Sequence, residues 1–293
     1  MGKTALSLHL GERLGGEVVS ADSRLFYRGM DIGTAKPTPE ERARVPHHLI
    51  DIADPDETVG LAEFKRMAEE AIADVHARGR LPMLVGGTGQ YVRAVVEGWT
   101  PPAVPPDPAL RAELEEQAQQ EGAEALHARL ASIDPEAAAR IDPRNVRRVI
   151  RALEVCLTTG KPFSAQRRRT PPPYRILQIG LTMDREALYA RADARVESMM
   201  EAGLVDEVHR LVEAGYRWDL PSMSGVGYAQ FRPYFEGKAT LEDVVAEIKR
   251  ATRRLIRHQY NWFRLSDPRI HWFDVAHTPP EKIEAFVRKW LEE

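Results

Sequence analysis

The feature that most restricts the fold is a glycine-rich turn between a short apolar run and a helical pattern. Residues 81–85 form the apolar run, Gly86-Gly87-Thr88-Gly89 follows directly, and residues 91–97 have helical periodicity. Earlier in the chain, residues 17–20 have the pattern of a buried strand, which ends in Ala21-Asp22-Ser23. Strands that alternate with helices through short turns are typical of a parallel α/β sheet, in which ligands bind beyond the carboxyl ends of the strands.

The same alternation appears on both sides of a break in the middle of the chain. The periodicity predicts helices at residues 4–14, 64–78, 185–202 and from 280 onward, and strands at residues 174–181 and 270–274. The stretch from Trp99 through Pro108 contains five prolines, and residues 109–140 are rich in Ala and Glu with helical spacing. We therefore expect an α/β core formed by residues 1–104 and 143–293, and a helical insertion at 105–142 that extends at most to about residue 173.

The composition excludes several classes of protein. The chain has 293 residues, of which 43% are hydrophobic and 29% charged, and this balance is typical of a soluble globular protein. No apolar run approaches the roughly 18 residues that a membrane span needs. A single cysteine, Cys156, excludes an intrachain disulfide and a thiolate zinc cage. The first residues also lack the pattern of a secretory leader, so we expect a cytoplasmic protein that does not bind a membrane. As a separate expectation, the protein is a monomer.

Gly2-Lys3-Thr4, placed directly before a helical pattern, matches the second half of a G-x-x-x-x-G-K-[ST] phosphate loop. The amides of a helix N-terminus attract phosphate, the Lys3 ammonium neutralises its oxygens, and the Thr4 hydroxyl is a ligand for Mg²⁺. The alternative is a chance occurrence of these residues after an initiator methionine.

Asp22 directly follows a predicted strand, on the side of the sheet where a phosphate loop holds its ligand. A carboxylate at this place has two chemical roles open to it. It can bind Mg²⁺ through water, or it can accept a proton from a nucleophile within hydrogen-bond reach. The alternative is a turn cap formed by Asp22 and Ser23.

Two further motifs have both a functional and a structural interpretation. Gly86-Gly87-Thr88-Gly89 offers backbone amides to a ligand and adds the Thr88 hydroxyl, or it is simply a tight turn from strand to helix. His47-His48 suggests metal binding, but neighbouring side chains diverge and the sequence offers no further ligands at metal-site spacing. We therefore expect hydrogen bonds from these two histidines rather than a metal site.

The net charge of −3 conceals two basic segments. The first carries Arg144, Arg147, Arg148, Arg151, Lys161, Arg167, Arg168 and Arg169 with one acid, Glu154. The second carries Lys249, Arg250, Arg253, Arg254, Arg257 and Arg264 with no acid, and Tyr260, Trp262 and Phe263 lie among them. Such segments favour a polyanionic partner, with aromatic rings that stack on bases or pack in the core. The alternative is a pair of solvated basic faces.

Seven segments together resemble one protein family. They are Gly2-Lys3-Thr4, Val19-Ser20-Ala21-Asp22-Ser23, the run from Tyr27 to Pro37 (YRGMDIGTAKP), Pro46-His47-His48-Leu49-Ile50-Asp51, Val85-Gly86-Gly87-Thr88-Gly89, the run from Arg147 to Glu154 (RRVIRALE) and Ser224-Gly225-Val226-Gly227-Tyr228. This set resembles the tRNA dimethylallyltransferases, also called tRNA isopentenyltransferases. The likeness covers nearly the whole chain, and the eleven residues from Tyr27 to Pro37 are its most specific part.

The resemblance implies both a fold and a reaction. The fold is an α/β sheet of the P-loop NTPase type, parallel and flanked by helices, with a helical insertion domain. The reaction transfers a dimethylallyl group from dimethylallyl diphosphate to N6 of the adenosine immediately 3′ of a tRNA anticodon, with Mg²⁺ as the cofactor. The implied partners are therefore the anticodon stem-loop of tRNA and dimethylallyl diphosphate.

The resemblance also implies roles for individual residues. Asp22 corresponds to the general base and Thr4 to a catalytic hydroxyl that also binds the metal. The diphosphate is bound by Gly2, Lys3, Thr4 and an arginine, for which Arg195 is favoured over Arg191. The positions that match tRNA-contacting stretches are Asp22, Ser23, Arg24, Leu25, Thr88, Arg147, Arg148, Val149, Ile150, Arg151, Met223, Ser224, Gly225, Val226, Gly227 and Tyr228.

The chain departs from the family pattern at its first residue. Family members place a strand and Gly-Pro-Thr-Ala plus one residue before Gly-Lys-Thr, and here Met1 occupies the last of those places. We therefore expect a version extended by about six apolar residues and the rest of that loop to be more stable and more active.

Two other functions are compatible with parts of the sequence. A P-loop small-molecule kinase shares Gly-Lys-Thr and a carboxylate beyond a strand, but it leaves the two basic segments unexplained. A non-catalytic RNA-binding protein accounts for the basic segments, but it does not need Asp22 or the glycine loop.

Overall fold

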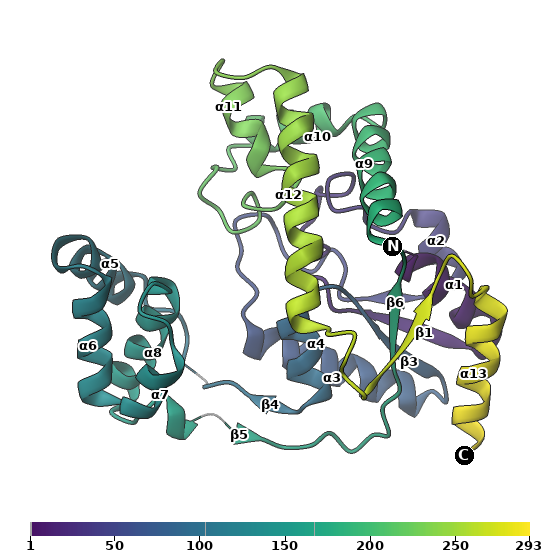
Figure 1. Cartoon of the computed structure of the whole chain (residues 1–293), viewed down its shortest axis with the longest axis horizontal. Coiled ribbons are helices and arrows are strands. Elements are labelled where there is room, and N and C mark those ends of the chain that lie inside the picture. Colours follow the sequence, from purple (N-terminus) through teal and green to yellow (C-terminus); the bar gives the residue numbers. More distant parts are fainter. Residues whose placement is uncertain (1, 103, 167) are drawn as a thin grey trace. The chain divides into compact units, whose positions relative to one another are not determined.

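The computed structural model describes residues 2–102, 104–166 and 168–293 (Figure 1). It divides into two compact units, unit 1 with Met1–Val95 and Pro173–Glu293, and unit 2 with Val96–Pro172. The insertion predicted at residues 105–142 falls within unit 2, whose bounds are wider. The predictions made for Met1 and Arg167 lie outside the described residues.

A parallel sheet forms the centre of unit 1. Strand β1 (Gly16–Ser20) lies between β2 (His47–His48) and β3 (Leu81–Val85), and both neighbours run parallel to it. Every residue of β1 is buried, as expected for a strand that is covered on both faces. A second parallel pair, β6 (Gln178–Thr182) with β7 (Ile270–Asp274), belongs to the same unit. The predicted parallel α/β class is confirmed.

Helices α1 (Lys3–Leu14) and α3 (Leu61–Ala77) pack against β1 and β3. Three aromatic rings from different segments fill the core beside the sheet. Phe64 and Tyr91 stack with ring centroids 4.2 Å apart, and Phe26 stacks on both rings at 5.9 Å. This cluster fixes the segment that follows β1 against α3 and α4 (Gly89–Val96).

A second core of unit 1 is formed by α9 (Arg185–Glu201), α10 (Leu204–Glu213), the short helices η2 (Ala229–Phe231) and α11 (Arg232–Phe235), and α12 (Leu241–Trp262). Helices α2 (Pro39–Arg44) and α13 (Pro280–Glu292) belong to the same unit but not to this core. The core of this layer is built around buried Met223, Tyr228, Phe231 and Ile248. Helix α12 packs along α9, and α13 packs on α1. Figure 1 shows α9 to α12 beyond the edge of the parallel sheet and α13 beside α1.

Unit 2 is mainly helical. Its helices are α5 (Pro108–Glu121), α6 (Ala123–Ile133), α7 (Pro135–Arg140), α8 (Val146–Thr159) and the short η1 (Ser164–Gln166). Leu114, Leu126, Leu130 and Leu153 are fully buried at its centre. The sequence patterns did not predict its two-stranded antiparallel sheet, β4 (Trp99–Thr100) with β5 (Arg168–Arg169).

The element predictions from periodicity hold with small shifts at their ends. The strand predicted at residues 174–181 begins only at Gln178. Tyr174 does not join the strand, since its ring stacks on His76 at 5.1 Å between centroids. The helix predicted from residue 64 begins three residues earlier, at Leu61.

Candidate active site at the carboxyl edge of the parallel sheet

The ends of β1 and β3 lie against each other. The Ala21 amide donates to the Val85 carbonyl at 2.8 Å, and the Thr88 amide donates to the Ala21 carbonyl at 3.3 Å. A Cβ atom at Gly86 would lie 2.1 Å from the Ala21 oxygen, so only glycine fits at this position. The tight-turn interpretation therefore accounts for Gly86, and the turn brings Thr88 to the end of β1.

Asp22 and Ser23 lie at this junction. The Ser23 amide donates to Thr88 Oγ1 at 3.2 Å, and the Arg24 amide donates to Asp22 Oδ1 at 3.1 Å. Asp22 thus caps its own turn, as the structural interpretation of the sequence predicted. The cap uses one carboxylate oxygen, and Oδ2 has no hydrogen-bond partner among the residues that the structure describes. Half-buried Asp22 therefore keeps an oxygen available for a proton or a ligand.

Lys3 begins helix α1 and points toward the glycine loop. Its Nζ is 3.7 Å from the place that a Cβ atom would take at Gly87. Burial lowers the pKa of the Lys3 ammonium, the Asp22 carboxylate raises it, and the Arg195 guanidinium lowers it again. These mutual effects place Lys3, Asp22 and Arg195 in one charged group, which we call the Lys3 cluster.

Arg195 comes to the Lys3 cluster from helix α9. Desolvation and the charge of Arg191 lower the pKa of its guanidinium, whereas Glu41 and Asp22 act in the opposite direction. Arg191 is therefore close enough to Arg195 to act as a second cation. Gly2 caps α1 in the left-handed conformation at φ 87°, and Thr4 lies in the first turn of the helix. Excess positive charge beside a helix N-terminus suits a multiply charged anion.

The C-terminal part of α12 forms a wall over the glycine loop. Gln259 Nε2 donates to the Gly87 carbonyl at 3.3 Å. Trp262 packs so closely on Gly89 that a Cβ atom there would lie 2.2 Å from the indole Cγ. Arg93 donates to the Trp262 carbonyl at 2.7 Å and lies over the indole ring. Of the two roles open to the aromatic residues, Trp262 therefore has the packing role.

The side chain of Arg24 links the loop from Ser222 to Tyr228 to the segment that contains Asp22. The Arg24 guanidinium donates to the carbonyls of Pro221 and Ser222 and to Ser224 Oγ. The structure thus brings together two stretches that the resemblance assigns to tRNA, residues 22–25 and 223–228. Both terminal nitrogens of Arg24 therefore donate to acceptors within the protein.

Several side chains that the resemblance assigns to tRNA contact are buried in the structure. Met223 and Tyr228 are 0% and 1% exposed, and both belong to the core of unit 1. Val149 and Ile150 belong to the core of unit 2 in the same way. Arg151 donates to Glu154 Oε2 and to the Val104 carbonyl. The four apolar and aromatic side chains therefore belong to the cores, whereas the Arg151 side chain is 32% exposed.

Most of the second basic segment is neutralised by acids from elsewhere in the sequence. The pairs along α12 are Lys249 with Glu197, Arg253 with Asp193, and both Arg250 and Arg254 with Glu247. The sequence interval contains no acid, but α9 and the preceding turn of α12 supply them. Arg147 and Arg148 on α8 differ, because both are exposed and have no ion-pair partner within the described part of the chain.

A buried carboxylate that sequence reasoning missed explains the most specific segment of the chain. Glu207 on α10 is 2% exposed. It accepts from the amides of Asp31 and Ile32 at 2.9 and 2.7 Å, from Gly33 at 3.1 Å, and from the Tyr228 hydroxyl at 2.6 Å. Burial and this carboxylate strongly raise the pKa of Tyr228. Glu207 therefore joins the segment from Tyr27 to Pro37 to the loop that ends at Tyr228. The sequence carried one indirect sign of this role, the high specificity of the segment from Tyr27 to Pro37.

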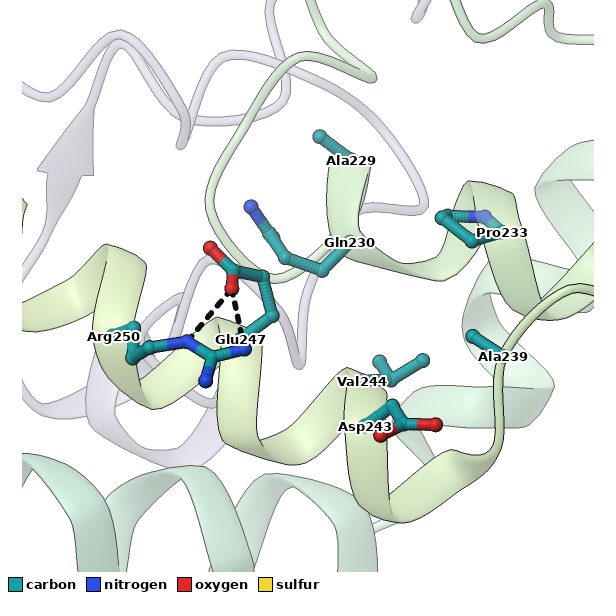
Figure 2. Close-up of a pocket in the computed structure, with 8 residues that line it drawn as sticks. All are labelled: Ala229, Gln230, Pro233, Ala239, Asp243, Val244, Glu247 and Arg250. Carbon is teal, nitrogen blue, oxygen red and sulfur yellow. Dashed lines mark hydrogen bonds and ion pairs between the residues drawn. The ribbon is translucent and has the colours of Figure 1, made fainter.

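A pocket of about 310 Å³ lies elsewhere in unit 1, against the first half of α12 (Figure 2). Small and apolar residues such as Ala229, Pro233 and Val244 line it, and the Glu247–Arg250 pair borders it. It contains no member of the Lys3 cluster, so it is separate from the candidate active site.

The two adjacent histidines make hydrogen bonds, as predicted. His47 Nδ1 lies 2.7 Å from the Val45 carbonyl, and His48 Nε2 lies 2.8 Å from Glu17 Oε2. Among residues 2–102, 104–166 and 168–293, no group of three His, Cys, Asp or Glu side chains is arranged to bind a metal. In the same residues, no helix is long and apolar enough to span a bilayer.

Comparison with known proteins agrees with this geometry. Residues 25–266 match the family described as IPP transferase. The tRNA dimethylallyltransferase of Roseiflexus sp. (strain RS-1) is 58% identical over 292 residues, which cover 100% of this chain and 96% of that protein. The tRNA dimethylallyltransferase of Roseiflexus castenholzii is 63% identical over 292 residues, with 100% and 95% covered.

Two solved structures are similar over almost the whole chain. The tRNA isopentenylpyrophosphate transferase of Bacillus halodurans is 45% identical with a TM-score of 0.73, and the match covers 99% of this chain and 93% of that one. A eukaryotic dimethylallyltransferase acting on tRNA is 26% identical with a TM-score of 0.85, and the match covers 99% and 77%. Sequence and fold agree, and the chain belongs to the tRNA dimethylallyltransferase family.

Proposed function

We propose that this protein transfers a dimethylallyl group from dimethylallyl diphosphate to N6 of the adenosine immediately 3′ of a tRNA anticodon. The observation that carries the proposal is the Lys3 cluster, in which one half-buried carboxylate with an available oxygen lies beside two cations. A base and an anion-binding group side by side are what an alkyl transfer with a diphosphate leaving group requires.

Asp22 is the proposed general base. Adenine N6 is a weak nucleophile because its lone pair is delocalised into the ring. As the bond from N6 to the allylic carbon forms, the carbon–oxygen bond to diphosphate breaks, and Asp22 takes the proton that N6 loses. The hydrogen bonds of Asp22 Oδ1 and Ser23 fix the carboxylate at the strand end, and Oδ2 is the oxygen that would accept this proton.

Lys3, Arg195 and Arg191 are the proposed diphosphate ligands, together with the amides of Gly2 and Thr4 at the start of α1. They stabilise the negative charge that grows on diphosphate as it leaves. The desolvation that lowers the pKa of Lys3 also strengthens its attraction to an anion.

The residues present also fit a Mg²⁺ ion. The Thr4 hydroxyl and the Asp22 carboxylate are hard oxygen donors, and an ion that takes most of its ligands from diphosphate and water needs no more than these. When bound, Mg²⁺ would supply further charge stabilisation for the leaving group. Thr4 is the proposed direct ligand.

The proposed RNA partner is the anticodon stem-loop. Arg147 and Arg148 have the exposure and the unpaired charge that phosphate contacts need. Ser23, Thr88, Ser224 and the backbone of residues 225–227 are the proposed contacts near the reacting base, which must leave the loop stack to reach Asp22.

One assay tests the proposal against the kinase and RNA-binding alternatives. The protein is incubated with Mg²⁺ and either dimethylallyl diphosphate labelled in the prenyl group or ATP labelled in the γ-phosphate, with and without tRNA. The proposal predicts prenyl label on adenosine only when tRNA is present, and no transfer from ATP. Transfer from ATP to a small molecule, or RNA binding without any transfer, would contradict it.

A further inference from the structure

Arg24 lies two residues after the proposed base, and its side chain crosses to a loop about 200 residues further along the chain. Nη1 donates to the Pro221 carbonyl at 2.6 Å and to the Ser222 carbonyl at 3.2 Å, and Nη2 donates to Ser224 Oγ at 3.3 Å. The side-chain stem lies against Gly225, with Cδ and Nε each 3.5 Å from the place of a Cβ atom there. The planar fork of a guanidinium suits such a set of acceptors, whereas an ammonium does not.

The backbone of Arg24 connects to the other side of the site. Its amide donates to Asp22 Oδ1 at 3.1 Å, which is the bond that orients the carboxylate. One residue therefore contacts both the proposed base and the loop at residues 221–225.

The segment from Ser222 to Tyr228, which contains the Arg24 contact, is fixed by a buried hydrogen bond at each end. Ser222 is fully buried, and its hydroxyl donates to the Pro55 carbonyl at 2.6 Å. Tyr228 at the other end donates to buried Glu207. Ser224 between them is exposed, and apart from its local bonds to Leu220 and Pro221 it is held by Arg24.

We propose that Arg24 is a positioning residue for prenyl transfer, which sets Ser224 and Gly225 at a fixed place relative to Asp22. This inference rests on the proposed function, because it concerns how the adenosine is presented to the base. A nucleotide that contacts the loop then meets Asp22 in one geometry, and errors in such geometry are costly for rate. The role differs from the direct RNA contact that the sequence suggested for Arg24.

The two roles predict different behaviour of two variants. If Arg24 positions the loop, Arg24→Ala and Arg24→Lys both lower the single-turnover rate at saturating tRNA by about tenfold. The slope of tRNA affinity against salt concentration stays at the parent value, since no phosphate contact is lost. The KM for dimethylallyl diphosphate also stays unchanged.

A direct phosphate contact predicts the opposite pattern. The lysine ammonium would then largely preserve activity in Arg24→Lys, because it keeps the positive charge. Arg24→Ala would reduce the slope of tRNA affinity against salt concentration by about one. Either result would overturn the proposal, as would parental rates in both variants. Arg28→Ala is the matched control, because Arg28 is half-exposed, lies in the same segment and, among the described residues, forms its ion pair with surface Asp54 at 2.8 Å.

Amide hydrogen exchange tests the contact separately from catalysis. The Ser224 and Gly225 amides donate to Leu220 and Ser222 carbonyls within the loop. We expect faster exchange at these amides in Arg24→Ala than in the parent and in Arg28→Ala, and equal exchange would contradict the proposal. Absence of prenyl transfer by the parent protein would instead contradict the proposed function, while the exchange result would still decide whether Arg24 holds the loop.

Discussion

Two lysines of unit 1, Lys36 and Lys3, lie in charged groups that differ in how many hydrogen bonds the ammonium makes. Lys36 is 8% exposed and donates to the Tyr27 carbonyl at 2.8 Å and to Asp31 and Asp51 at 2.5 Å each. All three of its donors are therefore used. Lys3 lies beside Asp22 and Arg195, yet its ammonium makes no hydrogen bond or ion pair to another residue in the described ranges.

This difference separates a structural charge from a binding charge. A buried ammonium is costly unless it is paired, and the Lys36 group meets that need within the protein. The fold leaves Lys3 short of partners, so the burial that lowers its pKa is not offset by the nearby Asp22 carboxylate. A charge that is kept near others without full pairing is typical of a site whose missing partner is a ligand.

The largest effect is expected when the Lys3 cluster loses the Asp22 carboxylate and keeps a side chain of the same shape. We expect Asp22→Asn to lower prenyl transfer by roughly 10²-fold or more, because loss of a general base typically has that effect. Its melting temperature and its affinity for tRNA should stay close to the parent values. Single-turnover assays and thermal melts measure the two effects, with Asp54→Asn as a surface control. A large loss of stability with an unchanged rate would make Asp22 a structural carboxylate.

The same substitution at the two lysines should have different effects on stability. Lys36→Met removes the donor of the Tyr27 carbonyl and of Asp31 and leaves Asp51 with Arg42 alone, so we expect about 2 kcal/mol lower free energy of unfolding. Lys3→Met removes a poorly paired charge, so the free energy of unfolding should stay equal or rise. Urea titration of both variants gives the values. Equal destabilisation by both would remove the distinction between the two groups.

The comparison extends to the arginines that are predicted to bind RNA. Arg147→Ala with Arg148→Ala should flatten the salt dependence of tRNA affinity by up to about two in slope, because these side chains have no partner in the described structure. Arg250→Ala with Arg254→Ala should change the slope less, since Glu247 already pairs with both. Filter binding at several salt concentrations measures both slopes. A larger change in the α12 variant would show that ion pairs within α12 open for RNA.

The smallest expected effect is on the pH dependence of stability. Burial lowers the folded-state pKa of Lys3 below 10.5, so between these two values the unfolded chain binds more protons than the folded one. The stability of the parent relative to Lys3→Met should therefore rise with pH toward 10.5, by less than about 1.4 kcal/mol per pH unit. Parallel curves of unfolding free energy against pH for the two proteins would contradict this sign.

Much of the fold and of the site could be predicted from local sequence patterns. Periodicity and glycine turns predicted β3 and β7 with their observed ends, because a short apolar run bounded by turn residues is a signal carried by neighbouring residues of the chain. Asp22 and Thr88 were found in the same way, since both follow directly after strands.

The parts that could not be predicted depend on partners far away in the sequence. The pairing of Arg253 with Asp193 joins residues 60 positions apart, so the basic stripe on α12 looked uncompensated. Glu207 has no local motif, and its role appears only when Gly33 and Tyr228 meet beside it. The burial of Val149 and Tyr228 could not be predicted either, because a shared motif does not tell core from surface.

The claim that the Lys3 cluster awaits an anionic ligand is tested most directly by melting with inorganic diphosphate and Mg²⁺. A ligand that binds only the folded state raises the melting temperature by mass action. We expect diphosphate to raise the melting temperature of the parent and of Lys36→Met, and to leave that of Lys3→Met unchanged. An equal rise for Lys3→Met and the parent would show that diphosphate binds elsewhere and would contradict the account.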